Sequence, residues 1–152
     1  MKIEKISDIY EVLKGYTRKK RLVVAFANDS HSIEAVYMAV KAGLVEGILV
    51  GDTETIQGVC KENGYDESCF KIVHEPNDVR GAEAAVEMIR NGEADVIMKG
   101  LVSTDKYMRA ILNKERGLVA PNAILSHVVV MECSSYHKLL TVSDVAVIPC
   151  PD

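Results

Sequence analysis

The sequence predicts a protein of the α/β class, with a parallel sheet covered by helices on both faces. Short continuous apolar runs alternate with segments whose apolar residues recur three and four positions apart, which is typical of strand–helix–strand units with right-handed crossovers. Glycines follow the helical segments at Gly15, Gly43, Gly64 and Gly92, where a left-handed residue commonly ends a helix. The 152 residues are 48% hydrophobic and 26% charged, which suits one soluble domain, alone or with part of another.

The elements of the first 117 residues can be placed in order from these two patterns. Helical stripes predict helices at residues 6–13, 33–40, 56–60, 82–89 and 107–112. Uninterrupted apolar runs predict strands that are buried on both faces, at residues 21–27, 47–50, 70–74 and 94–98. After the first helix, each strand is followed by a helix, as in a Rossmann-like sheet.

The helical spacing disappears after residue 117. The remaining sequence predicts only strands, with a turn at Ser134 and Ser135, at residues 123–131, 138–142 and 144–148. Apolar strands without covering helices are a liability, so this segment is either an added sheet edge or the opening of a second domain whose remainder is absent. We favour the second interpretation, with a first α/β domain at 1–117 and the opening strands of a second domain at 118–152. We expect these strands to be poorly covered, or covered by another chain.

Composition and charge argue against several classes of function. A net charge of −4 disfavours nucleic acid, since neutralising several phosphates needs clustered lysines and arginines. The basic run 18–21 is interpreted as a solvated strand entry. No segment has the roughly 20 apolar residues that span a bilayer, and the charged N-terminus has no apolar signal core, so we expect a cytoplasmic protein that binds no membrane. Cysteines and histidines lack the spacing of a metal site, and we expect no metal.

Polar loops follow the predicted strands, at residues 28–31, 51–53, 75–78 and 99–104. Ligands of open parallel α/β sheets bind outside the carboxyl ends of the strands, so these loops are the candidate site. Asp, Asn, Ser and Thr at such places are also ordinary N-caps, and capping is the preferred interpretation of the second and third loops. Asn28 and Asp29 of the first loop are candidates for lining a cleft.

The fourth loop carries more chemistry than the others. Lys99 and Gly100 leave the strand, Ser103 and Thr104 open the next helix, and Arg109 follows one to two turns later. Backbone N–H groups at a helix start suit an anion, and two hydroxyls with a lysine and an arginine favour phosphate. On spacing alone the anion site and plain helix capping both stay open, with capping slightly preferred. A nucleotide-binding P-loop and a G-x-G-x-x-G turn are both absent from the sequence, which weakens a dinucleotide interpretation.

The segment 94–112, ADVIMKGLVSTDKYMRAIL, resembles the signature of the phosphate acetyl/butyryl transferases. Within that family the phosphate butyryltransferase branch is nearest, and it is also resembled at residues 24–29, 49–52, 125–128, 131–132 and 143–152. The resemblance implies reversible acyl transfer, in which a short acyl group such as butyryl moves between CoA and inorganic phosphate to give acyl phosphate. It also implies an isopropylmalate dehydrogenase-like fold of two α/β domains, with CoA and phosphate as substrates and no cofactor.

The resemblance also implies roles for particular residues. It places Ser103, Thr104 and Arg109 at the phosphoryl end of the substrate and Lys99 and Gly100 in the adjoining turn. It places Ser126 and Asp144 in the cleft, beside the candidates of the first loop. The family's proposed base, an aspartate, and its CoA-contacting serine–arginine pair lie near the C-terminus of a chain about twice this long.

This chain therefore resembles the N-terminal half of such an enzyme, and we expect it to be inactive alone. We expect a homo-oligomer that binds acyl-CoA and phosphate. Two alternatives stay open, a non-catalytic anion- or nucleotide-binding Rossmann-like module and a related acyltransferase domain used within a larger assembly.

Overall fold

The structure is a computed structural model that describes residues 2–144. The chain divides into two compact units, which are described separately. The sheet unit is Arg18–Ala120, and the hairpin unit combines Met1–Thr17 with Pro121–Asp152. The strand expected at residues 144–148 lies almost wholly outside the described residues.

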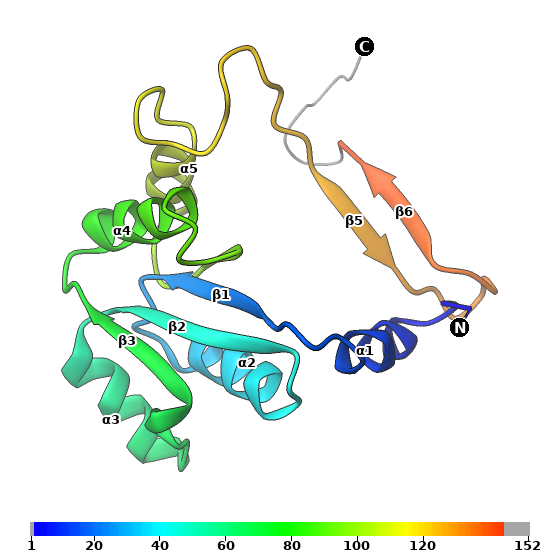
Figure 1. Ribbon diagram of the computed structural model, residues 1–152, viewed down its shortest axis with the longest axis horizontal. Coiled ribbons are helices and arrows are strands. Elements are labelled where there is room, and N and C mark those ends of the chain that lie inside the picture. Colours follow the sequence, from blue (N-terminus) through cyan, green and yellow to red (C-terminus); the bar gives the residue numbers. More distant parts are fainter. Residues whose placement is uncertain (1, 145–152) are drawn as a thin grey trace. The chain divides into compact units, whose positions relative to one another are not determined.

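The sheet unit contains a four-stranded parallel sheet in the order β3-β2-β1-β4. Figure 1 shows β3, β2 and β1 of this sheet. Its strands are β1 (Lys20–Ala25), β2 (Val45–Gly51), β3 (Phe70–His74) and β4 (Val96–Lys99). The continuous apolar runs predicted all four, because a strand covered on both faces has no polar side to alternate with. The α/β class and the parallel sheet are thus confirmed.

Helices cover both faces of this sheet (Figure 1). They are α2 (Ser30–Lys41), α3 (Thr53–Asn63), α4 (Asp78–Arg90) and α5 (Thr104–Ile111), with a short 3₁₀ turn η1 (Glu67–Cys69). Successive side chains of a strand point to opposite faces, so the fully buried Val23 packs in the core with α4 while Val24 packs in the core with α2 and α3. Each such buried side chain contributes roughly 1.5–3 kcal/mol.

The glycines end these helices largely as predicted. Gly43, Gly64 and Gly92 have positive φ values of 75°, 69° and 68°. Gly15 differs, with φ −75°, because its N–H closes a last right-handed turn on the Val12 carbonyl.

The strand order places a topological switch point between β1 and β4. From β1 the chain steps outward to β2 and then β3, and α4 then leads to β4 on the other side of β1. The two loops that leave β1 and β4 therefore depart in opposite directions along the sheet. In open α/β sheets the ligand crevice forms at such a point, outside the carboxyl ends of the strands.

The hairpin unit contains α1 (Ile6–Lys14) and an antiparallel pair, β5 (Val128–Met131) and β6 (Leu140–Ser143). The Ile6 N–H donates to the Glu132 carboxylate at 2.8 Å. The sequence placed this helix with the sheet, whereas the structure groups it with the hairpin, since none of its residues is buried in a core.

The strand predicted at 123–131 is shorter than expected. Only residues 128–131 find partners in β6, and Asn122, with φ 64°, lies just ahead of the predicted strand. No described residue after Ala110 is fully buried, and Ile124 is 81% exposed. The expectation of poorly covered strands is confirmed for the described residues, while their assignment to a second domain stays a prediction.

No helix within residues 2–144 combines the length and the apolar character of a membrane span.

Candidate functional site

Four helices begin at the carboxyl edge of the sheet, and each has a side-chain cap. Asp29, Asp52, Asn77 and Ser103 accept hydrogen bonds from backbone N–H groups of α2, α3, α4 and α5. The capping interpretation is therefore confirmed for all four loops. Capping satisfies only part of a helix start, so it does not decide whether a ligand also binds there.

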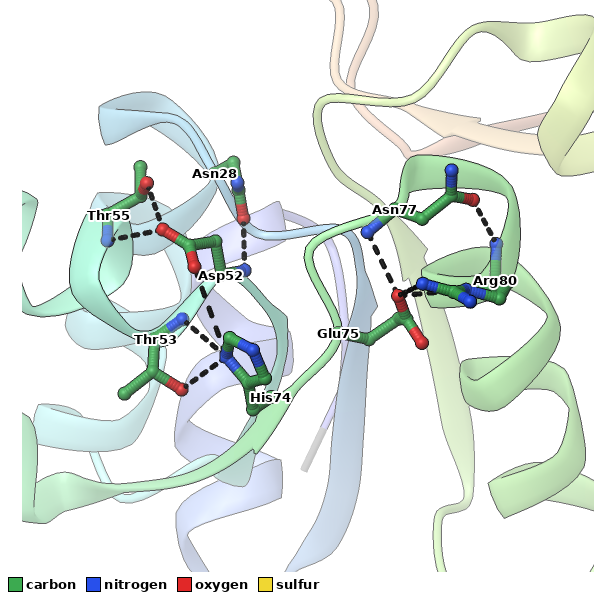
Figure 2. Close-up of polar contacts among 8 residues, drawn as sticks. All are labelled: Asn28, Asp52, Thr53, Thr55, His74, Glu75, Asn77 and Arg80. Carbon is green, nitrogen blue, oxygen red and sulfur yellow. Dashed lines mark hydrogen bonds and ion pairs between the residues drawn. The ribbon is translucent and has the colours of Figure 1, made fainter.

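The ends of β2 and β3 form the closed half of this edge, with its polar groups bonded to one another (Figure 2). The Asp52 carboxylate accepts from the Thr55 N–H at 3.0 Å and from its hydroxyl at 2.6 Å, which lowers the pKa of Asp52. The Asn28 carbonyl oxygen accepts from the Asp52 N–H at 2.9 Å. His74 Nδ1 accepts from the Thr53 N–H at 3.2 Å.

Glu75, Asn77 and Arg80 complete the closed half (Figure 2). Glu75 Oε1 accepts from the Asn77 N–H at 2.9 Å and from Arg80 Nε at 3.1 Å. Asn77 Oδ1 accepts from the Arg80 N–H at 3.1 Å. The charge of Arg80 is thus matched within its own loop.

The ends of β1 and β4, residues 26–29 and 99–104, form the open half. Gly100 and Leu101 donate backbone hydrogen bonds to the carbonyls of Ala25 and Phe26, at 3.0 and 2.8 Å. The ammonium of Lys99 donates to the Val102 carbonyl at 2.8 Å and more weakly, at 3.4 Å, to that of Gly100. Lys99 thus folds onto its own loop and brings its positive charge there.

The start of α5 offers the free donors of the open half. Ser103 Oγ accepts from the Lys106 N–H at 3.3 Å. Within residues 2–144, the N–H groups of Thr104 and Asp105 donate to no protein acceptor. The side chains of Ser103 and Thr104 are exposed. Free N–H groups and two hydroxyls at the positive end of a helix suit an anion.

Asp29 adds an unsatisfied acceptor to the same half. Its Oδ1 accepts from the Ser32 N–H at 2.8 Å, while its Oδ2 is buried and has no partner among the described residues. A buried carboxylate oxygen without a partner is costly, and a hydroxyl or a cation would satisfy it. Of the predicted residues, the structure thus brings Lys99, Gly100, Ser103 and Thr104 onto one edge with Asn28 and Asp29.

Arg109 does not reach this loop in the structure. Its guanidinium extends back by one turn and pairs with Asp105 at 3.0 Å, with 79% of the side chain exposed. It lines a groove of about 760 Å³ between α4 and α5, to which Arg90 and Arg116 also contribute. An exposed pair of this kind is weak, so the guanidinium can exchange Asp105 for another anion.

Ser126 and Asp144 belong to the hairpin unit. Ser126 is exposed ahead of β5, and Asp144 directly follows β6 with φ 56°. The Asp144 N–H donates to the His127 carbonyl at 2.7 Å. Asp144 Oδ1 and His127 Nδ1 are both buried without a partner in the described part of the chain.

Two features of the sheet edge escaped the sequence analysis. Lys106 Nζ pairs with the Asp78 carboxylate at 2.7 Å, which joins the starts of α4 and α5 and lowers the pKa of Asp78. Phe26 has a left-handed backbone with φ 63°. Neither has a local sequence signal, because one depends on two helices coming together and the other is rare for an aromatic residue. Among residues 2–144, no three acidic, histidine or cysteine side chains gather as metal ligands would.

Comparisons with known proteins converge on one group. The family model described as phosphate acetyl/butaryl transferase matches residues 72–152. A phosphate butyryltransferase of Clostridium acetobutylicum is 41% identical over 95% of this chain and 47% of its own length. A phosphate acetyltransferase of Thermotoga maritima is 32% identical over 96% and 48%.

A solved structure shares the fold. It is that of a phosphotransacetylase from Streptococcus pyogenes, which superimposes with a TM-score of 0.67 at 18% identity and covers 90% of this chain and 50% of that one. The chain spans about half the length of the curated relatives it matches.

Proposed function

Because the chain belongs to the phosphate acetyl/butyryl transferase family, we propose that the intact natural protein moves a short acyl group, butyryl or one of similar size, between CoA and inorganic phosphate. One observation carries the proposal. The family match, residues 72–152, includes the segment in which β4 ends and α5 begins, and this segment supplies the free donors of the open half. Those donors fit the phosphoryl group that both directions of the reaction share.

The chemistry asks the protein to position two anions rather than to supply a cofactor. In one direction a phosphate oxygen attacks the thioester carbonyl carbon, the carbon–sulfur bond breaks, and CoA leaves as a thiolate that takes up a proton. In the other direction the thiolate attacks the acyl phosphate and phosphate leaves. Orientation and stabilisation of the developing oxyanion supply most of the acceleration in such reactions, so we propose that CoA and phosphate are substrates and that no cofactor takes part.

The open half would hold the phosphoryl group. The N–H groups of Thr104 and Asp105 at the start of α5 have no acceptor among the described residues, and Ser103 Oγ caps the same turn through the Lys106 N–H. Lys99 adds a positive charge at the loop. These donors match the tetrahedral oxygens of phosphate, which accept several hydrogen bonds at once.

Arg109 would join the site by leaving Asp105. Its planar guanidinium offers paired donors to phosphate oxygens and keeps its charge at any working pH. The pair that it leaves is exposed on both sides, with 79% and 67% of the two side chains accessible. We retain Ser126 and Asp144 as candidates for the cleft, and the catalytic base is not assigned.

A direct assay tests the proposal. CoA release that depends on phosphate is measured for the intact natural protein with acetyl-, butyryl- and isobutyryl-CoA, and phosphate binding is measured separately by calorimetry. We expect turnover by the intact protein, and weak phosphate binding without turnover by the 152-residue chain. Phosphate binding by the intact protein with no turnover on any of the three thioesters would identify a non-catalytic anion-binding module instead.

A further inference from the structure

Phe26 stands at the end of β1 with φ 63°. This is the left-handed region, which a bulky side chain adopts only at a cost that the surrounding structure must offset. The other residues with positive φ among those described, glycines aside, are Asn122 and Asp144, which are types that tolerate this conformation. Strain of this kind is concentrated at functional sites and so raises the question of what it achieves here.

The strained backbone turns over one peptide group. In a parallel strand, successive residues direct their N–H and C=O groups to opposite neighbours. Ala25 faces β4, because its carbonyl accepts from the Gly100 N–H, and Phe26 should therefore face β2. Instead the Phe26 carbonyl accepts from the Leu101 N–H at 2.8 Å, on the β4 side, while the Ala27 N–H donates to the Val50 carbonyl of β2 at 2.7 Å.

Phe26 is thus inserted as a bulge, with Ala27 taking its place beside β2. Bulges redirect the chain and are common next to active sites. The regular alternative would relieve the strain, but it would direct the Phe26 carbonyl toward β2 and leave the Leu101 N–H without this acceptor. The strained form is the one that fastens the loop after β4 to the end of β1.

Two glycines accommodate this arrangement. A Cβ on Gly100 would collide with the Phe26 carbonyl oxygen and lie 2.9 Å from that of Ala25. Both obstacles are backbone atoms already committed to hydrogen bonds, so the loop would have to move. On the other side, a Cβ on Gly81 would lie 3.3 Å from Phe26 Cδ2, since the aromatic ring packs against α4.

We propose that Phe26 is a positioning residue of the phosphate site. Its reversed peptide group fixes Gly100 and Leu101 against β1 and so determines where the N–H groups and hydroxyls of Ser103 and Thr104 point. The inference rests on the proposed function, and Phe26 itself touches no phosphate. A displacement of about 1 Å in such a site can cost on the order of 100-fold in rate.

Three substitutions in the intact natural protein test the inference. Phe26→Val disfavours the left-handed backbone, because β-branched residues adopt it least readily, whereas Phe26→Asn removes the ring but accepts that backbone. Gly100→Ala attacks the same contact from the other side and provides an independent test if Phe26→Val does not fold. The matched control is Phe70→Val, which changes the other phenylalanine of the chain at the start of β3.

The readouts are the phosphate Kd, the KM for phosphate, kcat and the melting temperature. We expect Phe26→Val and Gly100→Ala to weaken phosphate binding by about 10- to 100-fold. Phe26→Asn should stay within about 3-fold of the wild type, even if its melting temperature falls. Phe70→Val should lower the melting temperature without changing the phosphate Kd.

The outcomes separate this inference from the proposed function. Unchanged phosphate binding in both Phe26→Val and Gly100→Ala, or an equal loss in Phe26→Asn, overturns the positioning role while wild-type turnover leaves the proposed function intact. A wild-type protein that neither binds phosphate nor turns over acyl-CoA removes both.

Discussion

Both halves of the sheet edge consist of strand ends followed by capped helix starts. They differ in which of their polar and charged groups have a partner within the protein. In the closed half, Asp52, Glu75 and Asn77 accept hydrogen bonds from the loop N–H groups and pair with Arg80, while the N–H groups of Glu54 and Asp78 have no acceptor among the described residues. In the open half, the start of α5 keeps free N–H groups and Asp29 keeps a buried oxygen without a partner among the described residues. Both halves have capped helices, so a cap does not distinguish a structural loop from a binding loop.

The difference follows from the strand order. The closed half lies between β2 and β3, which the chain connects by stepping in one direction, and the Thr53 N–H after β2 donates to His74 at the end of β3. The open half lies between β1 and β4, where the direction reverses. There Gly100 and Leu101 donate to the Ala25 and Phe26 carbonyls, and beyond these bonds the start of α5 and Asp29 keep polar groups that a ligand can satisfy.

The largest effect is expected for Arg109, which lies in α5 beside the open half. Losing a charge-assisted hydrogen bond to a bound anion costs roughly 1.5–3 kcal/mol, and about 1.4 kcal/mol corresponds to a factor of ten. Arg109→Ala should therefore lower kcat/KM by roughly 10- to 150-fold in the intact natural protein. Arg109→Lys should recover only part, because it keeps the charge and loses the planar fork.

Arg80→Ala is the matched control in the closed half. Its guanidinium pairs with Glu75, and 64% of its side chain is exposed, so its loss should change stability by about 0–1 kcal/mol and leave kcat/KM unchanged. Near-wild-type kinetics in Arg109→Ala, or an equal loss in Arg80→Ala, would mean that the two halves do not differ in function.

The sequence predicted the closed half better than the open half. The loop residues of 51–53 and 75–78 act as the caps that their types indicate, because capping involves only neighbouring residues. In the open half, the apolar run 21–27 predicted a strand that ends instead at Ala25, since Phe26 and Ala27 exchange partners with β4 and β2. That exchange depends on Leu101, far along the chain, and no local pattern encodes it. The pairing of Arg109 with Asp105 also went unpredicted, although its i,i+4 spacing is a signal for such a pair.

An effect of intermediate size is expected when one helix cap is removed in each half. Asn77→Ala and Ser103→Ala each remove the side chain that caps a helix, and each should lower the free energy of unfolding by about 0.5–2 kcal/mol, measured by urea denaturation. Only Ser103→Ala should also weaken phosphate binding, because its hydroxyl adjoins the free N–H groups of α5. Parallel losses of phosphate affinity in the two variants would show that the affinity follows stability rather than the open half.

The smallest effect at neutral pH is expected for Asp52→Asn, since asparagine caps a helix about as well as aspartate. The difference should appear in acid. Hydrogen bonds from Thr55 lower the pKa of Asp52 in the folded protein, so the ionised carboxylate stabilises the fold at every pH above its unfolded value of about 3.9. That stabilisation is lost as the pH falls below 3.9 and through the folded pKa. The melting temperature of the wild type should therefore fall more steeply than that of Asp52→Asn below about pH 4.

Glu54→Gln removes the same charge from the first turn of the same helix and is the control, with an acid limb that should follow the wild type. An acid limb of Asp52→Asn as steep as that of the wild type would show that the carboxylate is not held ionised by its own loop, and the closed half would then have capacity left for a ligand.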